Sequence, residues 1–157
     1  MFKPSGSLTG KIFVPGDKSI SHRALIFSAL AVGKSRITGL LEGEDVLATA
    51  DALRAMGAGI EKKDDVWTVH GVGVGGLMQP DNALDMGNSG TSTRLLMGLI
   101  ASHAISATFI GDASLTKRPM GRVIEPLSQM GADIRARETS DHKACLPLTV
   151  RGICPAI

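Results

Sequence analysis

An internal repeat of about 70 residues is the sequence feature that most limits how this chain can fold. The tripeptide Met56-Gly57-Ala58 returns 74 residues later as Met130-Gly131-Ala132, and Gly39 has a counterpart in Gly111, 72 residues further on. The elements expected around these landmarks also recur in the same order, which the chance recurrence of one tripeptide would not produce. Because the period exceeds that of solenoid repeats, the pattern predicts a duplicated small domain.

The first copy is predicted to have the element order βαβαββ. Clusters of apolar and β-branched residues between turn signals predict strands at 7–14, 35–40, 60–62 and 66–69. Apolar positions spaced three or four residues apart predict helices from 20 to about 32 and from about 42–45 to 57. Repeat unit one then covers about 8–70, and a glycine-rich linker covers about 71–83.

The second copy is predicted to repeat this order within unit two, about 84–151. Helices are expected from 88–91 through 100 and over 119–130, with strands at 107–110, 134–137 and 146–150. The predicted fold class is therefore α/β (α+β), with two βαβαββ units in this chain.

A possible anion site lies at residues 15–23, where the first long helix is predicted to begin. Ser19 is the expected N-cap, and Lys18 stands directly before it. Arg23 follows Ser19 by four residues, so its guanidinium can reach back to the same helix start. The unpaired N–H groups of a helix start favour phosphate or carboxylate, and the two cations add to this preference. A capped surface helix with two solvated cations is the competing interpretation.

Two further predicted helix starts also carry cations. Arg94 lies four residues after Gly90, and Arg118 is expected at the cap of a helix beginning at Pro119, between Lys117 and Arg122. Since cations are favoured at helix C-termini, their repeated placement at N-termini indicates an anion between them. A non-catalytic anion-binding module would satisfy the same pattern.

Composition argues against several other functions. A formal net charge of +2, 3% aromatic residues and no Tyr argue against nucleic-acid binding. Cys145 and Cys154 have neither CxxC spacing nor nearby histidines, so we expect no metal. The chain shows neither a signal peptide nor an apolar run of about 18 residues, so we expect no membrane contact and a cytoplasmic location.

The sequence resembles 5-enolpyruvylshikimate-3-phosphate synthases along nearly its whole length. The resemblance rests on Pro-Gly-Asp-Lys-Ser-Ile-Ser-His-Arg at 15–23, Gly-Asn-Ser-Gly-Thr-Ser-Thr-Arg at 87–94 and Gly-Asp-Ala-Ser-Leu-Thr-Lys-Arg-Pro-Met at 111–120. It implies transfer of the enolpyruvyl group of phosphoenolpyruvate to shikimate 3-phosphate, in aromatic amino-acid biosynthesis. It also implies a fold of repeated βαβαββ units in two domains, and no cofactor.

The resemblance assigns roles to the matched residues. Lys18 matches a catalytic lysine that contacts both substrates, and Ser19 and Arg23 match ligands of shikimate 3-phosphate. The residues matched to the phosphoenolpyruvate site are Lys18, Asn88, Gly90, Thr91, Arg94 and Arg118. The inhibitor glyphosate is a further expected ligand of that second site.

The family continues well beyond the length of this chain. The carboxylates and the lysine that it uses for proton transfer have no match here, so residues 1–157 are expected to be an N-terminal part that is inactive alone and whose partner is the rest of the enzyme. A related family transfers enolpyruvyl to a UDP-sugar, but it has Lys-Asn at the first motif and commonly a cysteine before the third. Here the first motif has Lys18-Ser19, and 112–117 contains no cysteine.

Overall fold

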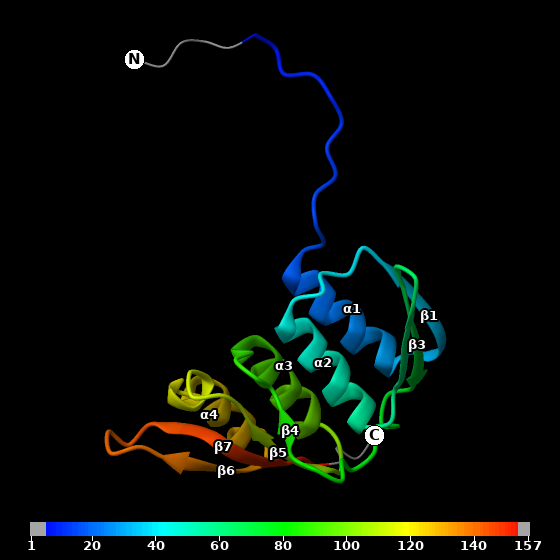
Figure 1. Ribbon diagram of the computed structural model, residues 1–157. Helices are drawn as coiled ribbons and strands as arrows, with labels where there is room; N and C mark the ends of the chain where they lie inside the picture. The colour runs from blue at the N-terminus through cyan, green and yellow to red at the C-terminus, as the bar shows by residue number, and fades with distance from the viewer. Residues whose placement is uncertain (1–5, 154–157) are drawn as a thin grey trace, which may run out of the picture.

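The computed structural model describes residues 6–153, which form two α/β layers joined by an extended connection (Figure 1). The first layer contains α1 (Lys18–Leu30), β1 (Val32–Thr38), α2 (Glu44–Ala55), β2 (Gly59–Lys63) and β3 (Val66–Val72). Its three strands are antiparallel, in the order β1-β3-β2. The helices α1 and α2 lie together on one side of this sheet.

The second layer is built in the same way, with one additional strand. It contains β4 (Leu84–Asp85), α3 (Gly90–Ala101), β5 (Ser106–Ile110), the 3-10 helix η1 (Leu115–Lys117), α4 (Gly121–Gln129), β6 (Asp133–Glu138) and β7 (Ala144–Arg151). The sheet order is β4-β5-β7-β6, with β4 parallel to β5 and the other pairs antiparallel. The mixed α/β fold class is therefore confirmed.

Corresponding glycines occupy corresponding places in the two layers. A Cβ on Gly71 would overlap the carbonyl oxygens of Ser28 and Ala31 at the end of α1, and a Cβ on Gly152 would overlap those of Ile100 and His103 at the end of α3. In both layers the last strand thus passes so close to a helix end that only glycine fits. These contacts support the division into two repeat units, whose boundaries stay a proposal.

Three helices form the interior of the molecule. Helix α2 packs against α1 on one side and α3 on the other, while α3 also contacts α4 (Figure 1). Leu25, Leu53 and Leu96, one from each of the first three helices, are fully buried in one continuous apolar core. This packing fixes the positions of α1, α2 and α3 relative to one another.

The strand predicted at 7–14 is wrong. These residues run as an extended segment away from the body, and Leu8, Ile12, Phe13 and Val14 are all largely exposed (Figure 1). A strand needs a neighbour to accept its backbone hydrogen bonds, and within residues 6–153 none lies beside this segment. In this structure the first layer therefore has αβαββ in place of the predicted βαβαββ.

Two predicted helix starts also differ from the structure. Asp17, not Ser19, is the N-cap of α1, because its side chain accepts a hydrogen bond from the N–H of Ile20 (2.8 Å). Helix α4 begins at Gly121 after Met120, so Arg118 is not at its cap. Arg118 follows η1 instead, where a short 3-10 turn interrupts the predicted helix start.

Candidate functional site

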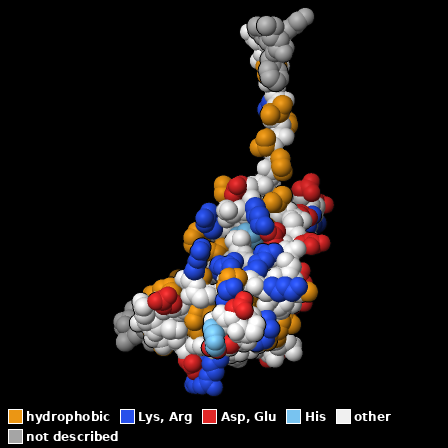
Figure 2. Space-filling model, turned by 90° about the vertical axis from the view of Figure 1, so that its left-hand side faces the viewer, with side chains coloured by type: hydrophobic (Ala, Val, Ile, Leu, Met, Phe, Trp, Pro, Cys, Tyr) orange, Lys and Arg blue, Asp and Glu red, His pale blue; other side chains and the backbone are white. Residues whose placement is uncertain are grey.

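The helices α1, α2 and α3 all begin on one face of the molecule (Figure 1). Figure 2 looks toward this face and shows Lys and Arg side chains gathered on it, close to where the N-terminal segment leaves the body. The unpaired N–H groups of several helix starts and the surrounding cations make this face favourable for anions. We call it the helix-start face.

Lys18, the first residue of α1, forms an ion pair with Asp45 in the first turn of α2. The Lys18 side chain is 54% exposed, whereas that of Asp45 is only 12% exposed. The Asp45 carboxylate also accepts a hydrogen bond from the N–H of Val46 (3.0 Å). The acidic partner is therefore fixed in the protein, while the ammonium remains accessible from the solvent.

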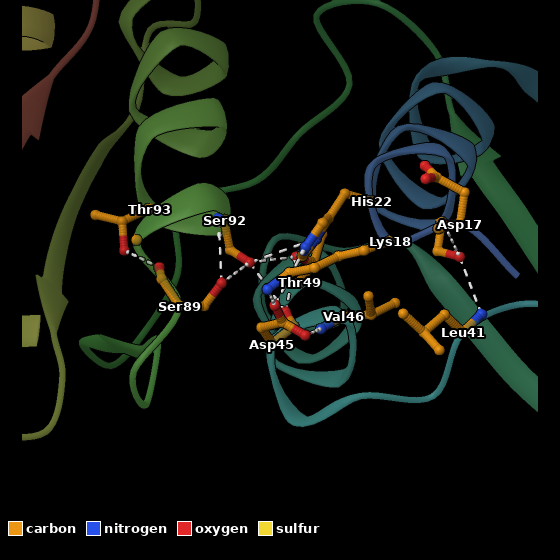
Figure 3. A network of polar contacts seen from close by, with 12 residues as sticks. Asp17, Lys18, His22, Leu41, Asp45, Val46, Thr49, Ser89, Ser92 and Thr93 are labelled. Carbon is orange, nitrogen blue, oxygen red and sulfur yellow. Dashed lines mark hydrogen bonds and ion pairs between the residues drawn. The ribbon is translucent and has the colours of Figure 1, made fainter. Parts of the chain in front are cut away.

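A buried chain of polar side chains joins the three helices directly beneath this ion pair (Figure 3). His22 Nδ1 lies 2.8 Å from the Thr49 hydroxyl, which donates to Ser92 (2.7 Å), and the Ser92 hydroxyl donates to the backbone carbonyl of Asp45 (2.9 Å). Ser89, the N-cap of α3, lies 2.6 Å from the Ser92 hydroxyl. These hydrogen-bonded side chains therefore connect the start of α1 to the start of α3 through α2.

The electrostatics of this cluster depend on burial and on one ion pair. Burial lowers the pKa of His22, and the Lys18 charge lowers it further, whereas Asp45 only partly offsets these effects. Burial alone would raise the pKa of Asp45, but Lys18, His22 and the Val46 N–H together bring it below its ordinary value. At neutral pH, His22 is therefore neutral and Asp45 is ionised.

A second group of cations surrounds Gly90, the first residue of α3. A Cβ at Gly90 would lie 2.6 Å from Arg94 Nη1 and 3.3 Å from Arg118 Nη1, so both guanidinium groups reach this helix start. Arg94 is held by the carbonyls of Gly90 (2.9 Å) and Pro119 (3.2 Å), and Arg118 donates to the Ser114 hydroxyl (3.2 Å). The structure thus brings together two predicted site residues that are far apart in sequence, Arg94 from α3 and Arg118 from a loop.

The other predicted ligands lie on the same elements but make fewer contacts. Ser19 and Arg23 are exposed on α1, while Asn88 and Thr91 are exposed beside Gly90. A hollow of about 520 Å³ lies elsewhere, between α2 and β4, and is lined mainly by the small and acidic residues of those elements. It contains none of the predicted ligands, so the candidate site is an open face and not this hollow.

Sequence reasoning missed four polar residues of the site: Asp45, His22, Thr49 and Ser92. His22 and Ser92 were inside motifs already singled out, but nothing in their spacing indicated contact across helices. A usable signal was the polar residue on an otherwise apolar helix face, as with Thr49 among Val46, Ala50 and Leu53. Buried polar groups on such a face require partners on a neighbouring element.

Metal binding and membrane insertion find no support in the described structure. Within residues 6–153, no three His, Cys, Asp or Glu side chains lie close enough together to hold a metal ion. Over the same residues, every helix is too short or too polar to cross a bilayer. Cys154 lies outside the described residues.

Comparison with known proteins shows similarity along the chain. The family model for EPSP synthase (3-phosphoshikimate 1-carboxyvinyltransferase) matches residues 2–155. A 3-phosphoshikimate 1-carboxyvinyltransferase of Sphingopyxis alaskensis is 69% identical over 99% of this chain, and one of Novosphingobium aromaticivorans is 68% identical over 99%. In both cases the chain spans 35% of the relative's length.

The fold also matches a solved structure. The EPSP synthase from Acinetobacter baumannii superposes with a TM-score of 0.86 at 49% identity, over 92% of this chain and 32% of that one. The chain therefore corresponds to about a third of its relatives.

The buried position of His22 predicts that stability depends on pH. Because its pKa is lowered in the folded state, the unfolded chain binds a proton first as the pH falls below about 6.5. The free energy of unfolding should therefore decrease between pH 7 and 5, by at most about 1.4 kcal/mol per pH unit from this residue. The contribution of Asp45 is lost in more acidic solution, as the pH falls from the ordinary pKa of an aspartate to the lowered pKa of the folded state.

Chemical denaturation at several pH values would measure this dependence. His22→Asn should flatten the profile between pH 7 and 5, whereas His70→Gln, at an exposed histidine of β3, should leave it unchanged. An unchanged slope in His22→Asn would contradict the prediction.

Proposed function

Because this chain belongs to the EPSP synthase (3-phosphoshikimate 1-carboxyvinyltransferase) family, we propose that it forms the anion-binding part of such an enzyme. The reaction is transfer of the enolpyruvyl group from phosphoenolpyruvate to the 5-hydroxyl of shikimate 3-phosphate, with release of phosphate. The observation that carries the proposal is that two cationic helix starts, those of α1 and α3, lie on one face, with Lys18 of α1 paired to Asp45 of α2. Each substrate has a phosphate and a carboxylate, so two anion sites side by side match this pair.

The start of α1 is the proposed site for shikimate 3-phosphate. Lys18 provides a compact charge, Ser19 an exposed hydroxyl, and Arg23 a planar group suited to bidentate contact with a carboxylate. The three residues lie on the first turns of one helix, so they can contact one ligand without any change in the backbone.

The start of α3 is the proposed site for phosphoenolpyruvate and for the inhibitor glyphosate. Arg94 and Arg118 already surround Gly90, whose missing side chain lets the Arg94 guanidinium lie close to the start of α3. Asn88 and Thr91 flank this position and remain exposed. Lys18 is ion-paired with Asp45, and the Asp45 carbonyl accepts a hydrogen bond from Ser92 of α3. Lys18 is therefore linked to the same region.

These residues bind and orient charge, but they do not supply the proton transfers of the reaction. Lys18 can donate hydrogen bonds to both substrates and is the proposed catalytic residue. Asp45 is ionised and paired with Lys18, so it is not a proton donor at neutral pH. We propose that the remaining acid–base groups come from the part of the enzyme outside this chain, and that the enzyme acts in the cytoplasm.

Turnover by the 157-residue chain alone should be undetectable. Each missing proton-transfer group typically costs about 10²–10⁴-fold in rate, and several are missing from the matched motifs. Phosphate release would be measured with both substrates and highly purified chain, and the Lys18→Ala variant would report contamination. A rate present in the parent and absent in Lys18→Ala would show that the chain is a complete enzyme.

Shikimate 3-phosphate should bind weakly to the chain, and Arg23→Ala should lower its affinity further. A charge-assisted hydrogen bond contributes about 1.5–3 kcal/mol, so we expect Kd to rise roughly 10- to 100-fold. Calorimetric titration would measure Kd, with Arg36→Ala as a control that removes the same charge from an exposed position on β1. Equal affinities for the parent and Arg23→Ala would refute this site.

Gly90→Ala should lower the affinity for ligands at the start of α3. Its methyl group would displace the Arg94 guanidinium, and crowding of this kind typically costs about 1–3 kcal/mol. We expect glyphosate to lose more affinity than phosphoenolpyruvate, because it is the longer ligand. Gly98→Ala is the matched control, since a methyl there has open space on the same helix. Equal losses for both ligands would contradict the expected discrimination.

A further inference from the structure

We propose that Asp45 is a positioning residue, which binds one N–H donor of Lys18 and directs the other two toward the anion sites of α1 and α3. The proposal rests on the proposed function for the identity of the two anions. It assigns a role to a residue outside the three motifs that carry the family resemblance, and the position of Asp45 between three helices supports it.

The Asp45 carboxylate is held more firmly than the lysine that it contacts. Val46 N–H donates to the carboxylate, and the Asp45 carbonyl accepts a hydrogen bond from Ser92 (2.9 Å), with the Thr49 hydroxyl oxygen 3.2 Å away. Thr49 and Ser92 are fully buried. Asp45 is therefore anchored through both its side chain and its backbone, so it can serve as a fixed reference for a flexible ammonium.

The number of donors on Lys18 fits two external ligands. An ammonium has three N–H donors and no acceptor. Within residues 6–153, Asp45 is the acceptor that the ammonium contacts, and the side chain remains 54% exposed. One donor is thus taken by the protein, and two remain for anions.

Asp45 also fixes the ammonium relative to the second site. Its side chain faces Lys18 of α1, while its carbonyl accepts a hydrogen bond from Ser92, which lies two residues after Gly90 in the first turn of α3. The position of the ammonium relative to α3 is therefore set through a single residue of α2.

His22 provides the carboxylate with a second potential partner. Each of the three contacts from His22 to the Asp45 carbonyl has one donor when His22 Nδ1–H donates to Thr49, Thr49 donates to Ser92, and Ser92 donates to the carbonyl. His22 Nε2 is then unprotonated, and among the described residues it is the buried side-chain nitrogen that lacks a hydrogen-bond partner. It lies 3.8 Å from Asp45 Oδ2, beyond hydrogen-bond length.

This geometry predicts how the carboxylate behaves without Lys18. Lys18 and Asp45 are the charged groups that act on His22 from α1 and α2, and the contacts from α3 are hydroxyls. Once the ammonium is removed, the carboxylate is free to turn toward a protonated Nε2. Loss of Lys18 should therefore raise the pKa of His22, and the rise should depend on Asp45.

A positioning role and a simple charge effect predict opposite signs for Asp45→Asn. A carboxylate beside an anion site repels the anion, so its removal would tighten binding if electrostatic repulsion were its main effect. If the Asp45 carboxylate orders Lys18, removing the carboxylate restores the rotamer freedom of the Lys18 side chain. Binding of the ligand must then suppress this freedom, which lowers the affinity. The direction of the change in affinity therefore separates the two roles.

Calorimetric titration with shikimate 3-phosphate is the first test. Asp45→Asn should weaken binding by about three- to tenfold, and the same substitution in a Lys18→Met background should cause no weakening. Asp141→Asn is the control, since it removes an equal charge next to Lys143 at a distant exposed position. Unchanged or tighter binding by Asp45→Asn would overturn the proposal.

Titration of the His22 ring by NMR is the second test and needs no ligand. Lys18→Met, at an exposed side chain, should raise the pKa of His22 more when Asp45 is present than when it is Asn. An equal rise in both backgrounds would overturn the proposal, whatever the calorimetric result. A parent chain that does not bind shikimate 3-phosphate would instead refute the proposed function, and the NMR result would still decide the role of Asp45.

Discussion

The structure of the candidate site depends on the buried hydrogen-bond chain from His22 through Thr49 and Ser92 to the Asp45 carbonyl. A buried polar group without a partner costs about 1–3 kcal/mol, so these side chains favour the one arrangement of helices in which they meet. Apolar packing holds α1, α2 and α3 together, but it allows small shifts along the interface. The hydrogen-bond chain restricts those shifts, because its members come from three different helices.

The positions of the exposed cations depend on this buried chain of hydrogen bonds. A helix start carries partial positive charge and weakly repels a nearby cation. Several helix starts and cations on one face would therefore tend to separate without a fixed acidic partner. Asp45 provides that partner for Lys18, while backbone carbonyls hold Arg94. The interior thus holds Lys18 and Arg94 in place on the helix-start face.

The family assignment limits which functions need consideration. The family match over residues 2–155 agrees with Lys18-Ser19 at the first motif, and it does not support the UDP-sugar enolpyruvyl transferases that were considered as an alternative. A free-standing anion-binding module would share the same helix-start face, but its relatives would not be synthases of almost three times the length. The lengths of these relatives support our proposal that the helix-start face is one part of a larger active site.

Local sequence determined the elements that carry their own signals. Periodicity and turn residues predicted α2, the β2–β3 hairpin and α3 close to their observed bounds, and the spacing from Gly90 to Arg94 predicted their contact, because one helical turn relates them. The segment 7–14 has the composition of a strand but lacks a neighbouring strand among residues 6–153, and strand formation depends on a partner that composition cannot supply. Only the tertiary structure decided that Ser92 meets Thr49 and Asp45, since these partners are 43 and 47 positions away in the sequence. Short-range spacing fixes which residues share a helix face, whereas the packing of the whole core decides which faces touch.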